Sequence, residues 1–141
     1  MKAFLDTSVL VAAFIEGHVH HERSFRLLGK CERKSACCGA PTIAEVYSTL
    51  TRMPQPLRVS GHDSLLFLGS IRERLSVIAL SETEYFEVIA ASAAAGVQGG
   101  AVYDAVLGQC ALKAGAKVLY TWNLSDYLRL PSDIAGRVRT P

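Results

Sequence analysis

The chain has no uninterrupted apolar run that approaches the roughly 18 residues needed to cross a membrane. Its first apolar run is broken by Asp6 and ends at Glu16. That run also lacks the basic start and the small-residue cleavage site of a signal peptide. These absences argue against the membrane and secretory classes, so we expect a cytoplasmic protein with no membrane partner.

Cysteine pairs with metal-site spacing are missing as well. The chain has four cysteines, at positions 31, 37, 38 and 110, and no C-x-x-C pair. In a reducing compartment these are expected to be thiols and not disulfides. Zinc bound by His18, His20 and His21 together with the cysteines is an open alternative. It is disfavoured because Cys37 and Cys38 are adjacent, and adjacent residues of a strand point to opposite faces.

A strong excess of charge of one sign is also absent. Fifteen Lys and Arg residues stand against thirteen Asp and Glu residues, a formal net charge of +2. This balance permits contact with nucleic acid, although proteins held mainly by phosphate contacts are usually far more basic. Half of the 141 residues are hydrophobic, which is enough for a real core, and the length suits one domain. We expect residues 1–141 to form a single domain.

What the sequence does contain is a regular alternation of short apolar runs and helix-like segments. Strands are expected at 2–5, 35–40, 76–80 and 117–121, the last being the final clear strand. Helices are expected at 7–15, 20–34, 42–53, 60–75, 81–96 and 101–115, with a short helix within 122–128. The strands read as continuous apolar runs without polar alternation, which is typical of a parallel sheet covered on both faces. In such a sheet ligands bind beyond the carboxyl ends of the strands.

Four acidic residues lie in otherwise apolar surroundings: Asp6, Glu45, Asp104 and Asp126. A carboxylate near a core is costly, so it is usually paired or bound to a metal. Taken singly, each has a simpler interpretation. Asp6 is a favoured type of helix cap, Glu45 suits the solvated edge of its helix, and Asp104 suits a first helical turn. The residues alone do not decide between metal binding and these ordinary helix positions.

Four segments, taken in order, resemble one known family. They read "FLDTSVLVAAF", "PTIAEVYSTLTR", "VYDAVLGQCALKAGAKVLYTWN" and "NLSDYLRL". Together they are similar to the PIN-domain ribonucleases, and more narrowly to the VapC-type toxins of bacterial toxin–antitoxin pairs. The resemblance runs from Met1 to about Pro131. It implies a three-layer α/β/α sandwich around a parallel sheet, in agreement with the alternation described above.

The resemblance also implies an activity. A ribonuclease of this family cleaves RNA with Mg²⁺ or Mn²⁺ held by carboxylates, is inhibited by a cognate antitoxin protein, and commonly forms a homodimer. Asp6, Glu45 and Asp104 match three of the family's acids. Asn123 stands where many relatives have Asp, and Asp126 is a candidate for the missing acid. The resemblance implies that Asp6 and Asp104 hold the metal, that Glu45 orients the attacking water, and that Thr121 supports a carboxylate by hydrogen bonding.

The choice of residues suits this chemistry, because Mg²⁺ prefers oxygen ligands and retains several waters. Like charges crowded in a metal-free site disfavour one another. If Asp6 is a ligand, the sequence therefore predicts that Asp6→Asn stabilises the protein when the metal is removed.

Basic and aromatic residues suggest where RNA would lie. Arg52 shares a helix with Glu45 and is expected to bind an RNA phosphate. The basic run within 23–34 is better interpreted as a solvated face. Trp122 is suited either to stacking on a base or to packing.

Two other functions stay open at this point. A phosphatase of the haloacid dehalogenase type also begins with an Asp after a strand, but it requires a second acid two positions later, where this chain has Ser8. A PIN-like module that only binds RNA or protein is the main alternative to the nuclease, because Asn123 carries no charge.

Overall fold

The computed structural model describes residues 1–141. Its centre is one sheet of five short strands: β1 (Ala3–Leu5), β2 (Ala36–Gly39), β3 (Ser76–Ile78), β4 (Val118–Tyr120) and β5 (Val138–Arg139). The strands lie in the order β3-β2-β1-β4-β5, and every neighbouring pair is parallel. The predicted α/β fold with a central parallel sheet is therefore confirmed. Because the chain proceeds from β1 in one direction and later returns to its other side at β4, β1 and β4 flank the switch point where such sheets bind ligands.

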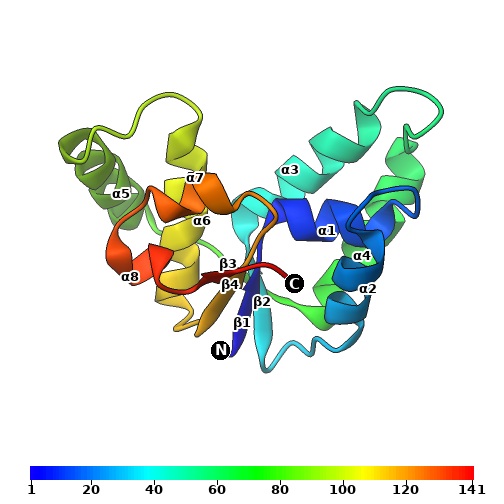
Figure 1. The fold of residues 1–141 in the computed structure, drawn as a ribbon, viewed down its shortest axis with the longest axis horizontal. Helices are drawn as coiled ribbons and strands as arrows, with labels where there is room; N and C mark the ends of the chain where they lie inside the picture. The colour runs from blue at the N-terminus through cyan, green and yellow to red at the C-terminus, as the bar shows by residue number, and fades with distance from the viewer.

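Eight helices cover the two faces of the sheet. They are α1 (Thr7–Phe14), α2 (His21–Gly29), α3 (Ala40–Thr51), α4 (Gly61–Arg74), α5 (Glu82–Ala94), α6 (Ala101–Lys113), α7 (Leu124–Leu128) and α8 (Ser132–Ala135). Figure 1 shows α1 to α4 on one side of the sheet and α5 to α8 on the other. Three helices, α1, α4 and α5, begin at a side-chain cap, and at the start of α5 Ser81 and Glu84 form a reciprocal capping box.

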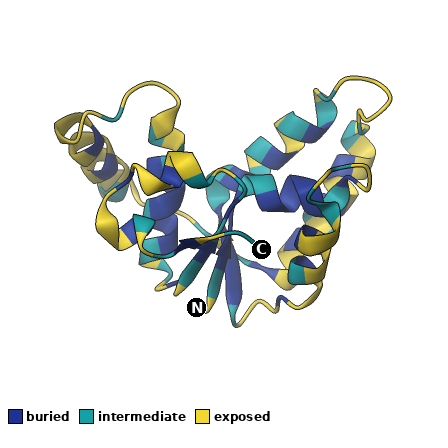
Figure 2. Ribbon diagram, in the orientation of Figure 1, coloured by how far each residue is buried: buried dark blue, intermediate teal, exposed yellow.

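Adjacent strand residues supply two separate cores. Phe4 and Cys37 are fully buried among side chains of α6 to α8, whereas Leu5 and Cys38 are fully buried among side chains of α1 to α4. Figure 2 shows this burial along the strands and the inward faces of the helices. The neighbouring cysteines thus face opposite sides of the sheet, as predicted. Burial raises the pKa of all four thiols to about 11 or 12, which is unfavourable for the thiolate that zinc requires.

The C-terminal part of the fold differs from the prediction. The strand at 117–121 is not the last one, because β5 follows it and pairs Val138 with Leu119. Only Val138 of this two-residue strand is buried, so no apolar run marks it in the sequence. The helix α8, which precedes β5, was not expected either. No helix in the structure combines the length and the hydropathy that crossing a membrane requires.

Candidate functional site

Asp6 lies where β1 ends and α1 begins. Its carboxylate caps α1 by accepting the Ser8 backbone N–H at 3.3 Å, and it also accepts the Ser8 hydroxyl at 2.7 Å. The hydroxyls of Thr121 and Tyr127 donate to the same carboxylate at 2.8 and 2.7 Å. Only 3 % of Asp6 is exposed. Asp6 is therefore a helix cap and, in addition, a buried carboxylate whose charge is stabilised by four hydrogen bonds.

The segment that follows β4 is tied to Asp6 through a second set of hydrogen bonds. The Ser8 hydroxyl accepts the backbone N–H of Trp122, and the Thr121 hydroxyl accepts that of Asn123, both at 3.0 Å. This contact is possible because β4 pairs with β1 in register, with Tyr120 beside Leu5. The position of Asp6 is thus set by residues more than 110 positions away in the chain.

Glu45 reaches the same region from the second turn of α3. Its carboxylate accepts the Thr7 hydroxyl at 3.0 Å, which links α3 to the start of α1. Burial raises the pKa of Glu45, the nearby charge of Asp6 raises it further, and the hydrogen bond from Thr7 opposes both effects. Glu45 is consequently a half-buried acid with one partner.

Asp104 stands in the first turn of α6 and has no hydrogen bond to its side chain. Burial raises its pKa to about 6, with further contributions from the charges of Asp6, Asp126 and Glu45. In the metal-free protein its negative charge is therefore unfavourable near neutral pH. A cation bound beside it would relieve this repulsion.

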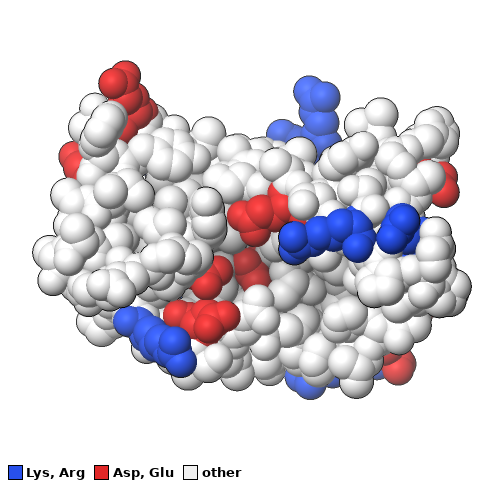
Figure 3. All heavy atoms as spheres, turned by 90° about the horizontal axis from the view of Figure 1, so that it is seen from above, with Lys and Arg blue, Asp and Glu red and all other residues white.

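The three acids meet in one cavity of about 500 Å³. Asp6, Glu45 and Asp104 line it together with Asn123, and imidazoles of His18 and His20 form part of its wall. Figure 3, which views the molecule from above the carboxyl ends of the strands, shows acidic side chains gathered at the centre of this face with basic side chains on either side. Residues distant in the sequence are thus brought together at the predicted edge of the sheet.

The donor set of this cavity suits a hard divalent cation. Its titratable oxygens are carboxylates, whereas the cysteines are buried in the two cores. No three His, Cys, Asp or Glu side chains are close enough to enclose a metal ion by themselves. Mg²⁺ does not need such a cage, because it retains several waters and binds through one or two carboxylates plus substrate phosphate. The residues therefore fit Mg²⁺ or Mn²⁺ and do not fit a structural zinc.

The other predicted site residues lie around this cavity. Asn123 lines it, but Asp126 lines a separate cavity of about 460 Å³, which meets the first one only at Asp104. Arg52 is exposed and lines a shallow hollow beside Glu45, together with Tyr103. Asp126 thus shares a cavity with Asp104 but not with Asp6 or Glu45.

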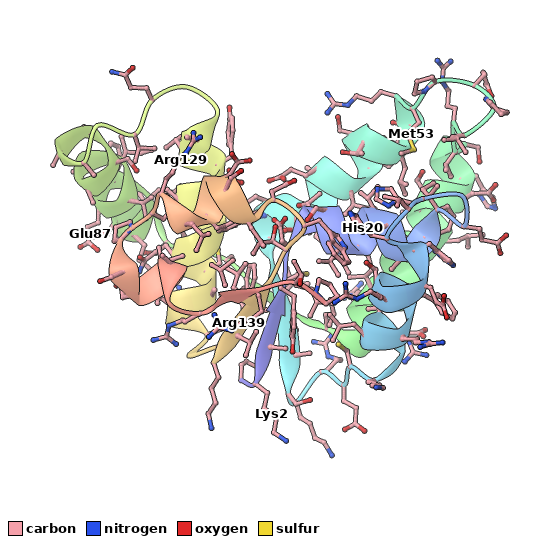
Figure 4. The ribbon with its side chains drawn as sticks, viewed as in Figure 1. Lys2, His20, Met53, Glu87, Arg129 and Arg139 are labelled. Carbon is pink, nitrogen blue, oxygen red and sulfur yellow. The ribbon has the colours of Figure 1, made fainter.

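Sequence reasoning missed three residues at the site. Tyr127 is fully buried and donates to Asp6 across 121 positions of sequence, a contact that no local pattern signals. His18 and His20 were considered only as zinc ligands, yet both line the acidic cavity. The His20 ring stacks on Trp122 with 3.7 Å between ring centroids, and the indole N–H donates to Ser24 at 2.8 Å. One face of Trp122 is therefore occupied by packing, and His20 lies beside α1 (Figure 4).

Comparison with known proteins agrees with this geometry. The family model described as "PIN domain" matches residues 3–124. The chain belongs to the PIN-domain family. This match spans β1 to the start of α7 and includes Asp6, Glu45, Asp104 and Asn123, but it ends before Asp126.

Two curated PIN-domain relatives are VapC proteins of Mycobacterium tuberculosis. Ribonuclease VapC40 is 38% identical over 114 residues, which is 81% of each chain. Ribonuclease VapC27 is 30% identical over 114 residues, covering 81% of this chain and 80% of the relative. The chain is therefore a VapC-type PIN-domain protein. Among solved structures, the VapBC2 complex of Rickettsia felis bound to a promoter DNA fragment contains a chain with TM-score 0.68 and 19% identity, covering 100% of this chain and 99% of the other. That likeness concerns the fold.

Proposed function

We propose that the protein is a metal-dependent ribonuclease that acts as the toxin of a type II toxin–antitoxin pair. The single observation that carries this proposal is the cavity in which Asp6, Glu45 and Asp104 converge from three elements. The names of the two relatives, both ribonucleases, support the same reaction class. The substrate would be an RNA phosphodiester, and the cofactor Mg²⁺ or Mn²⁺.

We assign the metal to Asp6 and Asp104, with Glu45 as the residue that orients the attacking water. When bound, such a cation lowers the pKa of a water and neutralises charge on the scissile phosphate. Asp6 suits a ligand with a fixed orientation, because Thr121 and Tyr127 hold its carboxylate. Asp104 suits a ligand whose charge the cation neutralises, because its carboxylate has no hydrogen-bond donor or ion-pair partner in the protein.

Asn123 and Asp126 would assist a second metal or the leaving group. Asn123 can offer a carbonyl oxygen but no charge, and Asp126 is separated from the main cavity. We therefore expect any second metal to bind weakly without RNA. Arg52, which forms no ion pair in the structure, would bind an RNA phosphate beside Glu45.

The cellular setting follows from the family. We propose that residues 1–141 act as one nuclease domain, that the protein works in the cytoplasm where RNA is accessible, and that it forms homodimers and an inhibited complex with a cognate antitoxin. Structural neighbours crystallised as VapBC complexes support an antitoxin partner. Production of the chain alone should slow bacterial growth, and co-production of its antitoxin should relieve the effect.

The deciding experiment is cleavage of RNA by the purified protein with Mg²⁺ or Mn²⁺. EDTA should abolish cleavage, and Asp104→Asn should lower it at least about 100-fold, because even outer-shell partners of a metal contribute 10–100-fold. Asp133→Asn is the matched control, since Asp133 is also an aspartate in a first helical turn but lies outside the cavity. RNA binding without any cleavage would instead favour the binding module considered above.

A further inference from the structure

A second cavity lies on the far side of Asp104 from the acidic cavity. It has a volume of about 460 Å³ and is bounded by residues 95–98, by the start of α6 and by α7 with Arg129 and Leu130. This size suits a small organic ligand or part of one. Because Asp104 lines both cavities, anything bound in the second one is next to the group assigned to the metal.

The one cationic side chain of this cavity is free. Arg129 makes no ion pair and no side-chain hydrogen bond, although Asp126 lies three residues earlier in the same cavity. Arg137 and Arg139, further along the chain, differ because their guanidinium groups donate to backbone carbonyls. Figure 4 shows Arg129 beneath the loop that joins α5 to α6. Its planar donor fork is therefore available for a ligand.

The remaining walls combine small apolar surfaces with one amide. Ala95, Val97 and Leu130 contribute apolar surface, while Gln98 supplies a side chain that both donates and accepts. A cavity with apolar surface and a few polar groups can hold an aromatic heterocycle. Sequence-specific recognition of RNA takes up unstacked bases, which stack on aromatic rings or on Arg guanidinium planes and are hydrogen-bonded at their edges. Arg129 is the side chain of this cavity that can do both.

We propose that this cavity binds one unstacked nucleobase of the RNA, preferably guanine, adjacent to the scissile phosphate, with Arg129 as the residue that selects it. The inference rests on the proposed function, because it assumes an RNA strand held at Asp104. Guanine is favoured because its O6 and N7 are two acceptors on one edge, which match the guanidinium fork. Arg129 then determines specificity and takes no part in the cleavage step.

The test is to map cleavage sites on a pool of random single-stranded RNA. Wild-type protein should show guanine enriched at one fixed position close to the cut. Arg129→Ala should remove this enrichment and lower kcat/KM on guanine-containing RNA about 10-fold or more, with an unchanged Mn²⁺-induced shift in Tm. Arg129→Lys retains the positive charge but lacks the planar pair of N–H donors of a guanidinium group. It should therefore also lose the guanine enrichment. Arg72→Ala removes the charge of an arginine on α4 that lines none of the cavities described above, and should leave the enrichment intact.

Replacing that guanine by 7-deazaguanine, which lacks N7, should weaken cleavage by wild type but not by Arg129→Ala. Retention of the same base preference by Arg129→Ala would overturn the inference while leaving the nuclease intact. The inference would also be overturned if Arg129→Ala changed only the affinity for the antitoxin, because the cavity would then bind a protein partner.

If wild type cleaves no RNA, the proposed function fails, and the inference is judged by binding of the same RNAs with Ca²⁺ in place of Mg²⁺. Guanine-dependent binding that Arg129→Ala removes would uphold it. Binding without base preference would overturn it.

Discussion

Asp6 and Asp104 line the same cavity, but the protein holds them in opposite ways. Asp6 is 3 % exposed and accepts four hydrogen bonds. Asp104 is half-buried and accepts none, and its pKa is raised to about 6. The folded chain surrounds the first carboxylate with hydrogen-bond donors, whereas it leaves the second without a donor and near other acids. Substitution of the two residues should therefore affect folding in opposite directions, even where both abolish cleavage.

Asp6→Asn should produce the largest change in stability. The amide cannot accept all the hydrogen bonds that the carboxylate accepts, so buried hydroxyl groups lose partners, at a cost of about 2 kcal/mol in the free energy of unfolding. Urea denaturation in EDTA measures this directly. Asn caps a helix about as well as Asp, so a loss of this size separates the buried network from simple capping. If the Asp6→Asn protein is as stable as the wild type or more stable, the predicted opposite effects of substituting Asp6 and Asp104 are wrong.

Tyr127→Phe isolates one of those hydrogen bonds. Removing the hydroxyl that donates to Asp6 at 2.7 Å should cost about 1 kcal/mol, the usual net contribution of a buried hydrogen bond. The ring stays in place, so packing is largely preserved. Thermal melts of Tyr127→Phe and of the surface control Tyr85→Phe, with and without Mn²⁺, provide the measurement. Equal stability of the two variants would show that Asp6 does not depend on this contact.

Asp104→Asn should stabilise the metal-free protein at pH 7 by an amount on the order of 1 kcal/mol, after the discount that partial exposure requires. The folded pKa of about 6 lies above the ordinary value of 3.8, so the folded state binds the proton more tightly than the unfolded chain. Stability of the wild type in EDTA should therefore fall as pH rises from about 4 to about 6. This slope should be absent in Asp104→Asn. A wild-type profile with no such slope would contradict the assignment.

Glu45→Gln should have the smallest effect, a few tenths of a kcal/mol in EDTA. Burial and the charge of Asp6 disfavour the carboxylate, but the hydrogen bond from Thr7 offsets part of that penalty. The glutamine oxygen can still accept this bond, so the two contributions nearly cancel. A change of this size in the free energy of unfolding shifts Tm by about 1 °C. Differential scanning calorimetry at pH 7 can detect that shift. A loss of more than about 1 kcal/mol in the free energy of unfolding would show that the fold stabilises the Glu45 carboxylate, as we expect for Asp6 and not for Asp104.

Much of the fold was predictable because its signals are local. Apolar runs marked four of the five strands, and capping residues such as Ser81 and Glu84 marked helix starts. The opposite orientations of Cys37 and Cys38 follow from the strand repeat alone. The position of Asp6 at the carboxyl edge of the sheet was expected for the same kind of reason. The convergence of Asp104 with Asp6 was expected from the resemblance to the PIN-domain family, because Asp104 lies in a helix and follows no strand.

The sequence by itself thus determined the alternation of elements and the edge of the sheet at which Asp6 lies, because both depend on short-range periodicity. Only the tertiary structure decided how each acid is held. If Asp6 is a ligand, the sequence predicts that Asp6→Asn stabilises the metal-free protein, whereas the hydrogen bonds from Thr121 and Tyr127 lead us to predict a loss of stability. It also decided that Asp126 lines a different cavity from Glu45. The hydrogen bonds that hold Asp6 cross more than 110 residues, and Asp126 lines its cavity with residues from another helix and loop. Such contacts leave no local pattern, because each residue's environment is created by the packing of distant segments.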